Sequence, residues 1–221
     1  MVVVVFVLAS PLVVLAVERA IRHLTLAGEV AGNGAGRRLL PWQVEPTSSK
    51  LRVLVSGCVP LLLAAAALRF DAGPAILVSV VLLAFLICAA TDLLCYRVPD
   101  AVTYPGTVLV LAAAAVLPQG DLTEAVLGAL ICGGIFLSLT LLTRGGFGLA
   151  DGKLATFIGA ALGVTRAIDA VVLGVVIGGL CLLLLVLIGA VSLRQVTPYA
   201  PFLAAAAIVV TLLRGTAFAP L

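Results

Sequence analysis

The sequence predicts an all-α, polytopic membrane helix bundle with about eight transmembrane or membrane-embedded helices. Of its 221 residues, 63% are hydrophobic and 10% are charged, and the mean hydropathy is +1.32. Soluble domains are nearer half apolar and about a quarter charged. The apolar residues also gather in long runs, and a helix needs roughly 20 of them to cross the hydrocarbon core. Because backbone polar groups in lipid must be satisfied within the chain, we expect these runs to be helices rather than strands.

The apolar runs define the expected elements in chain order. The first, near residues 2–17, lacks a basic segment and a convincing small-residue cleavage site, which favours a span over a removable signal peptide. Residues 18–51 form a polar, basic stretch, expected to be a short helix and then a loop. The further spans are expected near residues 52–69, 73–91, 102–118, 123–143, 153–165, 167–191 and 199–213. The run at 153–165 is short, so we expect a half-length or tilted helix there.

The positions of the basic residues predict the orientation, because Lys and Arg are enriched on the cytoplasmic side. With the N-terminus outside, ten of the 13 Lys and Arg residues lie inside and three lie outside. We therefore expect both termini outside, a first span at 1–17, a short basic cytoplasmic loop at 18–51 and a membrane domain at 52–214.

Composition also argues against several classes of function. The net charge of +3 gives no support for nucleic-acid binding. The five cysteines contain no C-x-x-C pair, and most lie in apolar runs where a reduced thiol acts as a small hydrophobe. Because His23 is the single histidine, the sequence argues strongly against a histidine metal site and against a Ser-His-Asp triad. We expect neither a metal nor a cofactor.

Two acidic residues differ from the others by their position. Asp92 directly follows the run "VVLLAFLICAAT", and Asp151 lies between "LLTRGGFGLA" and "GKLATFIGAALG". An ionisable group at membrane depth is costly and marks a functional candidate, although a single interfacial aspartate is more often a helix cap. In the expected topology both lie on the cytoplasmic side at a similar depth. Packing of the third and sixth spans could therefore bring the two carboxylates together.

Paired carboxylates suit hydrolysis by general acid–base catalysis. Two facing carboxylates cannot both ionise cheaply, so they share a proton. Such a pair can activate a water molecule and protonate a leaving amine, which hydrolyses a peptide without a metal. Three glycines, Gly145, Gly146 and Gly148, would permit close approach of a peptide backbone to Asp151, or would simply form a flexible turn.

The residues at this point resemble a known family. "GLADGKL" is similar to the G-x-G-D-x-K motif of type IV prepilin peptidases, the membrane aspartic proteases of pilus and type II secretion systems. "TDLLCYRVPDAVTYPG" resembles their other aspartate motif, and "TPYAPFLAAAAIVV" resembles a later segment. The resemblance runs from about Lys50 to Arg214. It implies an endopeptidase of the bacterial inner membrane that removes the leader of a prepilin or pseudopilin at the cytoplasmic face.

By the same matching, the catalytic aspartates fall on Asp92 and Asp151. The residues expected to bind substrate or support the site are Gly148, Lys153, Arg97, Pro99 and Asp100. Two positions depart from the family pattern. Ala150 replaces the second glycine of G-x-G-D, which is unfavourable if that position requires positive φ. Asp100 replaces an asparagine, and either residue can cap the following helix.

A larger departure is that residues 18–51 contain no cysteine, whereas many bacterial members carry a longer cytoplasmic domain with paired C-x-x-C motifs and also methylate the new pilin N-terminus. We therefore expect peptidase activity without methyltransferase activity. Two alternatives stay open: a small ion- or proton-coupled transporter that uses the aspartates, and an inactive homologue that serves as a scaffold. The sequence specifies neither the substrate nor the oligomeric state.

Overall fold

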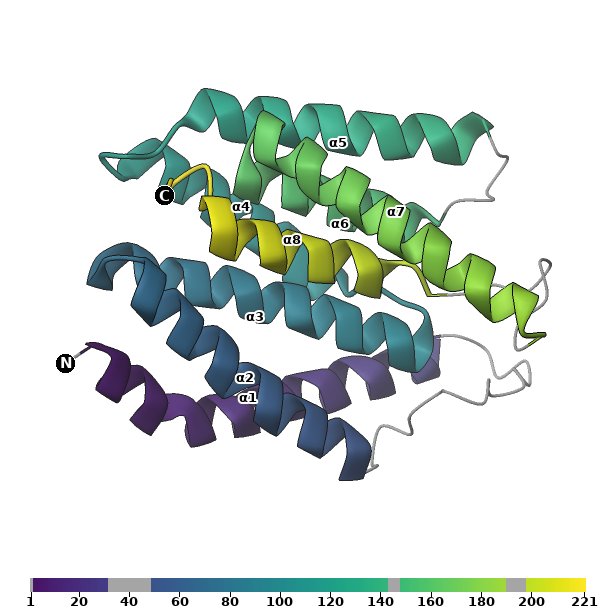
Figure 1. Ribbon diagram of the computed structural model, residues 1–221, viewed down its shortest axis with the longest axis horizontal. Helices are drawn as coiled ribbons and strands as arrows, with labels where there is room; N and C mark the ends of the chain where they lie inside the picture. Colours follow the sequence, from purple (N-terminus) through teal and green to yellow (C-terminus); the bar gives the residue numbers. More distant parts are fainter. Residues whose placement is uncertain (1, 32–48, 143–147, 190–197) are drawn as a thin grey trace.

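The computed structural model describes residues 2–31, 49–142, 148–189 and 198–221, and these residues form eight α-helices (Figure 1). In chain order the helices are α1 (Val2–Ala31), α2 (Ser49–Arg69), α3 (Ala72–Cys95), α4 (Asp100–Val116), α5 (Leu122–Leu142), α6 (Leu149–Leu162), α7 (Val164–Leu187) and α8 (Ala200–Arg214). The expected all-α helix bundle is confirmed.

Seven of the eight helices begin and end within a few residues of the apolar runs that predicted them. The exception is α1, which continues well past the expected end of the first span at residue 17. Its second half corresponds to the short helix expected at the start of the 18–51 segment. The remainder of that segment, residues 32–48, lies outside the described residues.

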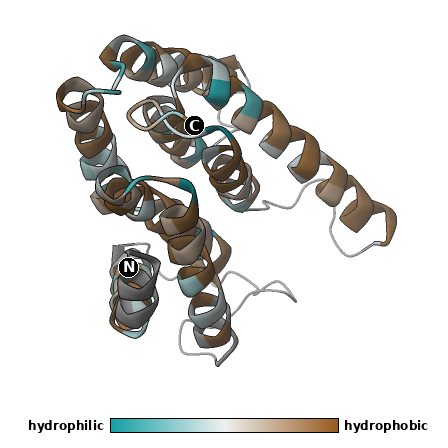
Figure 2. Cartoon of the chain, turned by 60° about the vertical axis from the view of Figure 1, so that its left-hand side comes forward, coloured by the Kyte–Doolittle hydropathy of each residue, from teal (hydrophilic) through white to brown (hydrophobic). Residues whose placement is uncertain are grey.

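The helices present apolar side chains to the outside of the bundle as well as to its interior. Among the described residues, α3, α5 and α7 are long and apolar enough to cross a membrane, and residues 55–69, 100–116 and 200–214 form shorter apolar helices. Most of the helical ribbon in Figure 2 has apolar colours, and the hydrophilic colour is concentrated near turns and helix ends. This pattern is what lipid as the surrounding solvent requires.

The short helix α6 lies inside the bundle, in contact with α4, α5, α7 and α8. Eight of its 14 residues are buried, from Leu154 to Leu162 with the exception of Thr156. Its closest neighbour is α5, because a Cβ on Gly159 would lie 2.2 Å from the carbonyl oxygen of Gly128. Two glycines thus allow the two backbones to touch, as small residues do in membrane helix pairs. At 1.5 Å per residue, α6 spans only about 21 Å, and it packs against four other helices.

The last residues of the chain fasten one end of the bundle. The Ala217 N–H donates to the carbonyl oxygen of Ala161 at 2.9 Å, and the Ala217 carbonyl oxygen accepts from the Asp121 N–H at 2.9 Å. At the same end, Glu124 Oε2 accepts from the Val164 N–H at 2.9 Å, which satisfies an otherwise open amide at the start of α7. The α4–α5 turn, the α6–α7 junction and the C-terminal segment are therefore held together.

Candidate active site

Asp92 lies near the C-terminal end of α3 and is only 5% exposed. Its Oδ2 atom accepts a hydrogen bond of 3.2 Å from the backbone N–H of Ala200, the first residue of α8. The start of a helix has unpaired amides and a partial positive charge, which favour an anion there. The packing of α8 against α3 thus gives this buried carboxylate a polar partner.

Asp151 lies in the first turn of α6, on the other side of the candidate site. Its N–H donates to the carbonyl oxygen of Gly148, the residue before the helix, at 3.1 Å. A Cβ built on Gly148 would lie 3.5 Å from Asp151 Oδ2, so the backbone passes close to this carboxylate. The other two glycines of the expected loop, Gly145 and Gly146, lie outside the described residues.

The structure places the two aspartates on helices that are far apart in the sequence but close in the fold. The rings of Phe85 on α3 and Phe157 on α6 lie 4.9 Å apart, centroid to centroid, and α8 packs against both helices. The charge of Asp151 acts electrostatically on the carboxylate of Asp92. Tyr199 immediately precedes Ala200, whose N–H bonds to Asp92. The C-terminal end of α3 and the start of α8 therefore meet at Asp92, and α6 packs against α8. This arrangement suits two carboxylates that share a proton.

A cavity of about 350 Å³ opens beside this meeting point. It is lined by Thr91 and Cys95, which flank Asp92 on α3, and by Ala150 of α6, which precedes Asp151. Four of the residues expected to support the site also line it: Arg97, Pro99, Asp100 and Lys153. The cavity is thus lined by sequence neighbours of both aspartates and by the charged side chains of Arg97, Asp100 and Lys153. Among the described residues there is no cluster of three or more His, Cys, Asp or Glu side chains that could hold a metal ion.

An ion pair crosses the edge of this cavity. Lys153 Nζ donates to Asp100 Oδ1 at 2.6 Å, and the same ammonium lies 5.6 Å from the centre of the Tyr104 ring. The pair links the first turn of α4 to the start of the second turn of α6. Asp100 thus occupies the first turn of α4, where an acidic residue is favourable to the helix, and it also pairs with a distant lysine.

Ala150, which replaces a glycine of the family motif, is not strained. It is the second residue of α6, and Tyr96 is the only non-glycine residue of the described chain with a positive φ. The position therefore does not require the conformation that glycine alone tolerates. Tyr96 ends α3 with a φ of 53°, and its N–H donates to the carbonyl oxygen of Asp92 at 2.8 Å. This turn leads the chain from Asp92 to the start of α4.

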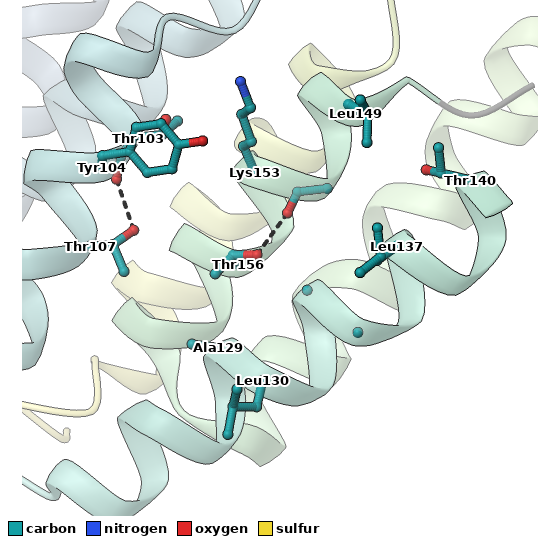
Figure 3. A pocket seen from close by; sticks show the side chains of 13 residues that line it. Thr103, Tyr104, Thr107, Ala129, Leu130, Leu137, Thr140, Leu149, Lys153 and Thr156 are labelled. Atoms are coloured by element: carbon teal, nitrogen blue, oxygen red, sulfur yellow. Dashed lines mark hydrogen bonds between the residues drawn. The ribbon is translucent and has the colours of Figure 1, made fainter. Parts of the chain in front are cut away.

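A second cavity, of about 510 Å³, is lined by residues of α4, α5 and α6 (Figure 3). It runs between α4 and α5, with Gly152 and Thr156 of α6 at its floor. The Thr107 and Thr156 hydroxyls donate to carbonyl oxygens one turn earlier in their own helices, at 2.8 and 2.9 Å. The groove therefore offers a largely apolar surface. Lys153 lines both cavities and so forms part of the wall between them.

Three residues near the aspartates were not found by sequence reasoning. Tyr199 and Ala200 approach the aspartates through the fold, and Tyr104 contacts Lys153 across the start of α4. The Ala200 contact is made by a backbone amide, which no side-chain pattern can indicate. The only available signal was the resemblance of the segment "TPYAPF", which contains two of the three.

Comparison with known proteins agrees with the resemblance. Residues 79–183 match the model of the type IV leader peptidase family. The protein named "Prepilin leader peptidase/N-methyltransferase" of Bacillus subtilis (strain 168) is 34% identical over 157 residues, which cover 70% of this chain and 62% of the relative. The chain thus spans about three fifths of the length of that relative. No solved structure matches the chain.

Proposed function

Because this chain belongs to the type IV leader peptidase family through residues 79–183, we propose that it is an aspartic endopeptidase that removes the leader of prepilin-like substrates. The observation that carries the proposal is the burial of Asp92 at the end of α3, within electrostatic reach of Asp151 at the start of α6 and beside a cavity lined by neighbours of both residues. Both belong to the segment that matches the family. The substrate would be a prepilin or a pseudopilin of a pilus or a type II secretion system.

The reaction requires one carboxylate to accept a proton and the other to donate one. The ionised carboxylate removes a proton from a water molecule that attacks the peptide carbonyl, and the protonated carboxylic acid gives its proton to the leaving amine. Burial of Asp92 and its proximity to Asp151 support the shared proton that this sequence of steps needs. The mechanism uses neither a metal nor a covalent intermediate.

The location of the site supports cleavage at a membrane face. Asp92 is close to the end of the long apolar helix α3, and Asp151 is in the first turn of α6. We propose that this is the cytoplasmic face of the bacterial inner membrane, because the distribution of Lys and Arg favours that orientation. A peptide bond just outside the hydrocarbon would be in reach of the two carboxylates.

Methylation of the new N-terminus is a separate question, since the name of the Bacillus subtilis relative includes an N-methyltransferase. We propose that this chain is a peptidase without that activity. The proposal rests on the sequence of residues 18–51, which contains no cysteine.

The test is leader cleavage by co-expressed protein. Each prepilin-like candidate from the same genome is expressed with the wild-type chain, with Asp92→Asn or with Asp151→Asn, and the mature N-terminus is identified by mass spectrometry. We expect cleavage by the wild type only, with all variants present in the membrane at equal levels. Asp71→Asn is the matched control, because Asp71 precedes the other end of α3 and makes no side-chain cap bond there.

Near-normal cleavage by either aspartate variant would show that the pair is not catalytic. No cleavage of any candidate by the wild type would favour the scaffold or transport alternatives. The same spectra report methylation, because a methylated N-terminus is heavier by one methyl group, and its appearance with this chain alone would contradict the second proposal.

A further inference from the structure

The ion pair between Lys153 and Asp100 is positioned to control the geometry of the aspartates without touching them. Lys153 follows Asp151 by two residues on α6. Two residues correspond to about 200° around a helix with 3.6 residues per turn, so the two side chains leave α6 on nearly opposite sides. Lys153 faces α4, where it pairs with Asp100, and Asp151 therefore faces away from α4. The lysine therefore links α6 to α4 on the side of α6 that lies away from Asp151.

The other end of the pair is tied to Asp92. Asp92 is joined to α4 by a short connection in which the Tyr96 N–H donates to the Asp92 carbonyl oxygen at 2.8 Å and Val98 is 3% exposed. Asp100 is the first residue of α4. Starting at Asp92, the chain thus leads through this connection to Asp100, across the ion pair to Lys153, and back along α6 to Asp151. The ion pair closes a ring of structure between the two carboxylates.

Both helix starts in this ring lack a side-chain cap. The residues before these helices, Gly148 and Pro99, have no side-chain group that could cap them. The contact between Lys153 and Asp100 is a direct polar link between the starts of the two helices. The ring of Tyr104 lies beside the ammonium at 5.6 Å, a distance at which its face attracts a cation.

We propose that Asp100, Lys153 and Tyr104 form a positioning device that sets the separation of Asp92 and Asp151. This inference rests on the proposed peptidase function. A displacement of about 1 Å in an active site can lower the rate by about 100-fold even when substrate binding is intact. Loss of the hydrogen-bonded contact between Lys153 and Asp100 is therefore expected to lower kcat rather than to raise KM.

The experiment compares four variants in the cleavage assay with kcat and KM determined separately. Lys153→Met and Asp100→Ala break the pair and are expected to lower kcat about 10- to 100-fold, with KM within about threefold of the wild type. Asp100→Asn keeps an oxygen that accepts from Lys153, and it should retain kcat within about threefold. The exchange of charges in Asp100→Lys with Lys153→Asp restores an ion pair between the two helices and should recover kcat above that of Lys153→Met and Asp100→Ala.

The matched control is Asp169→Ala, which removes the partner of Arg214 in another inter-helix ion pair of similar exposure, between α7 and α8. This variant should cleave like the wild type. Burial of Cys88 and Cys132, read by a thiol-reactive dye, reports whether each variant is folded.

The outcomes separate the two proposals. If the wild type does not cleave, the proposed function fails, and the positioning role that rests on it fails with it. If the wild type cleaves and Asp151→Asn does not, normal kcat for folded Lys153→Met overturns the positioning role. A raised KM with unchanged kcat in Asp100→Ala also overturns it, because that result assigns Asp100 to substrate binding.

Discussion

The crossing of α5 and α6 predicts that alanine is tolerated at Gly134 but not at Gly128, although both glycines lie on α5. A Cβ on Gly128 would lie 2.3 Å from the carbonyl oxygen of Gly159, whereas no atom lies within 4 Å of a Cβ on Gly134. Ordinary van der Waals contact begins at 3.4 Å, so the first variant is short of space by 1.1 Å (3.4 minus 2.3). The obstruction is backbone and cannot rotate away, so the helices must separate.

The size of the effect follows from comparing the two variants. Both gain the same intrinsic preference of alanine for a helix, about 1 kcal/mol, and this gain cancels in the comparison. Overpacking typically lowers the free energy of unfolding by about 1–3 kcal/mol and occasionally by more. Because two backbones collide, we expect Gly128→Ala to be at least about 2 kcal/mol less stable than Gly134→Ala. That difference corresponds to roughly 4–8 °C in Tm for a chain of this size.

The measurement is thermal unfolding of both purified variants in the same detergent. Cys132 is 3% exposed and lies one turn after Gly128, and Cys88 is fully buried. A dye that reacts with free thiols therefore reports the opening of the bundle around the substitution. Equal Tm values for the two variants would refute the reasoning, because they would mean that α5 and α6 do not depend on backbone contact.

Three further changes test other parts of the structure. Ala150→Gly should leave the cleavage rate equal or higher, since residue 150 lies in regular helix and lines the cavity, and a large loss in the leader assay would contradict this placement. Glu124→Ala should lower stability by about 1 kcal/mol through loss of the bond to the Val164 N–H, measured by the same dye. Phe218→Ala should lower the free energy of unfolding by roughly 3–5 kcal/mol, because this ring of the C-terminal segment is 1% exposed. A Tm like that of the wild type would show that the segment does not stabilise the bundle.

The helices could be predicted from the sequence because lipid imposes a simple requirement on composition. Each apolar run must form a helix, and the limits of seven helices follow within a few residues from where polar residues interrupt the runs. The first helix is longer than the expected span, because α1 continues into a polar sequence whose hydropathy does not predict a helix. There Ile21 and Thr25 are fully buried, so packing against the bundle rather than lipid sustains the helix.

The candidate site was predictable in part. Asp92 and Asp151 stood out because each interrupts an apolar stretch, and the expected topology placed them on one side. Their catalytic role stays a prediction that the cleavage assay must test. The ion pair between Asp100 and Lys153 was not predictable, because the two residues are separated by 53 positions and both were expected near the site for other reasons. The contact depends on how α4 and α6 pack, which periodicity does not report.

The bond between Asp92 and the Ala200 amide has a consequence for the order in which the protein is made. The ribosome produces α3 first, α6 later and α8 last, so both aspartates enter the membrane before the amide that bonds to one of them exists. An unfinished chain thus contains both aspartates without the amide that bonds to Asp92. Under the proposed function, cleavage activity is expected only after α8 has packed against α3.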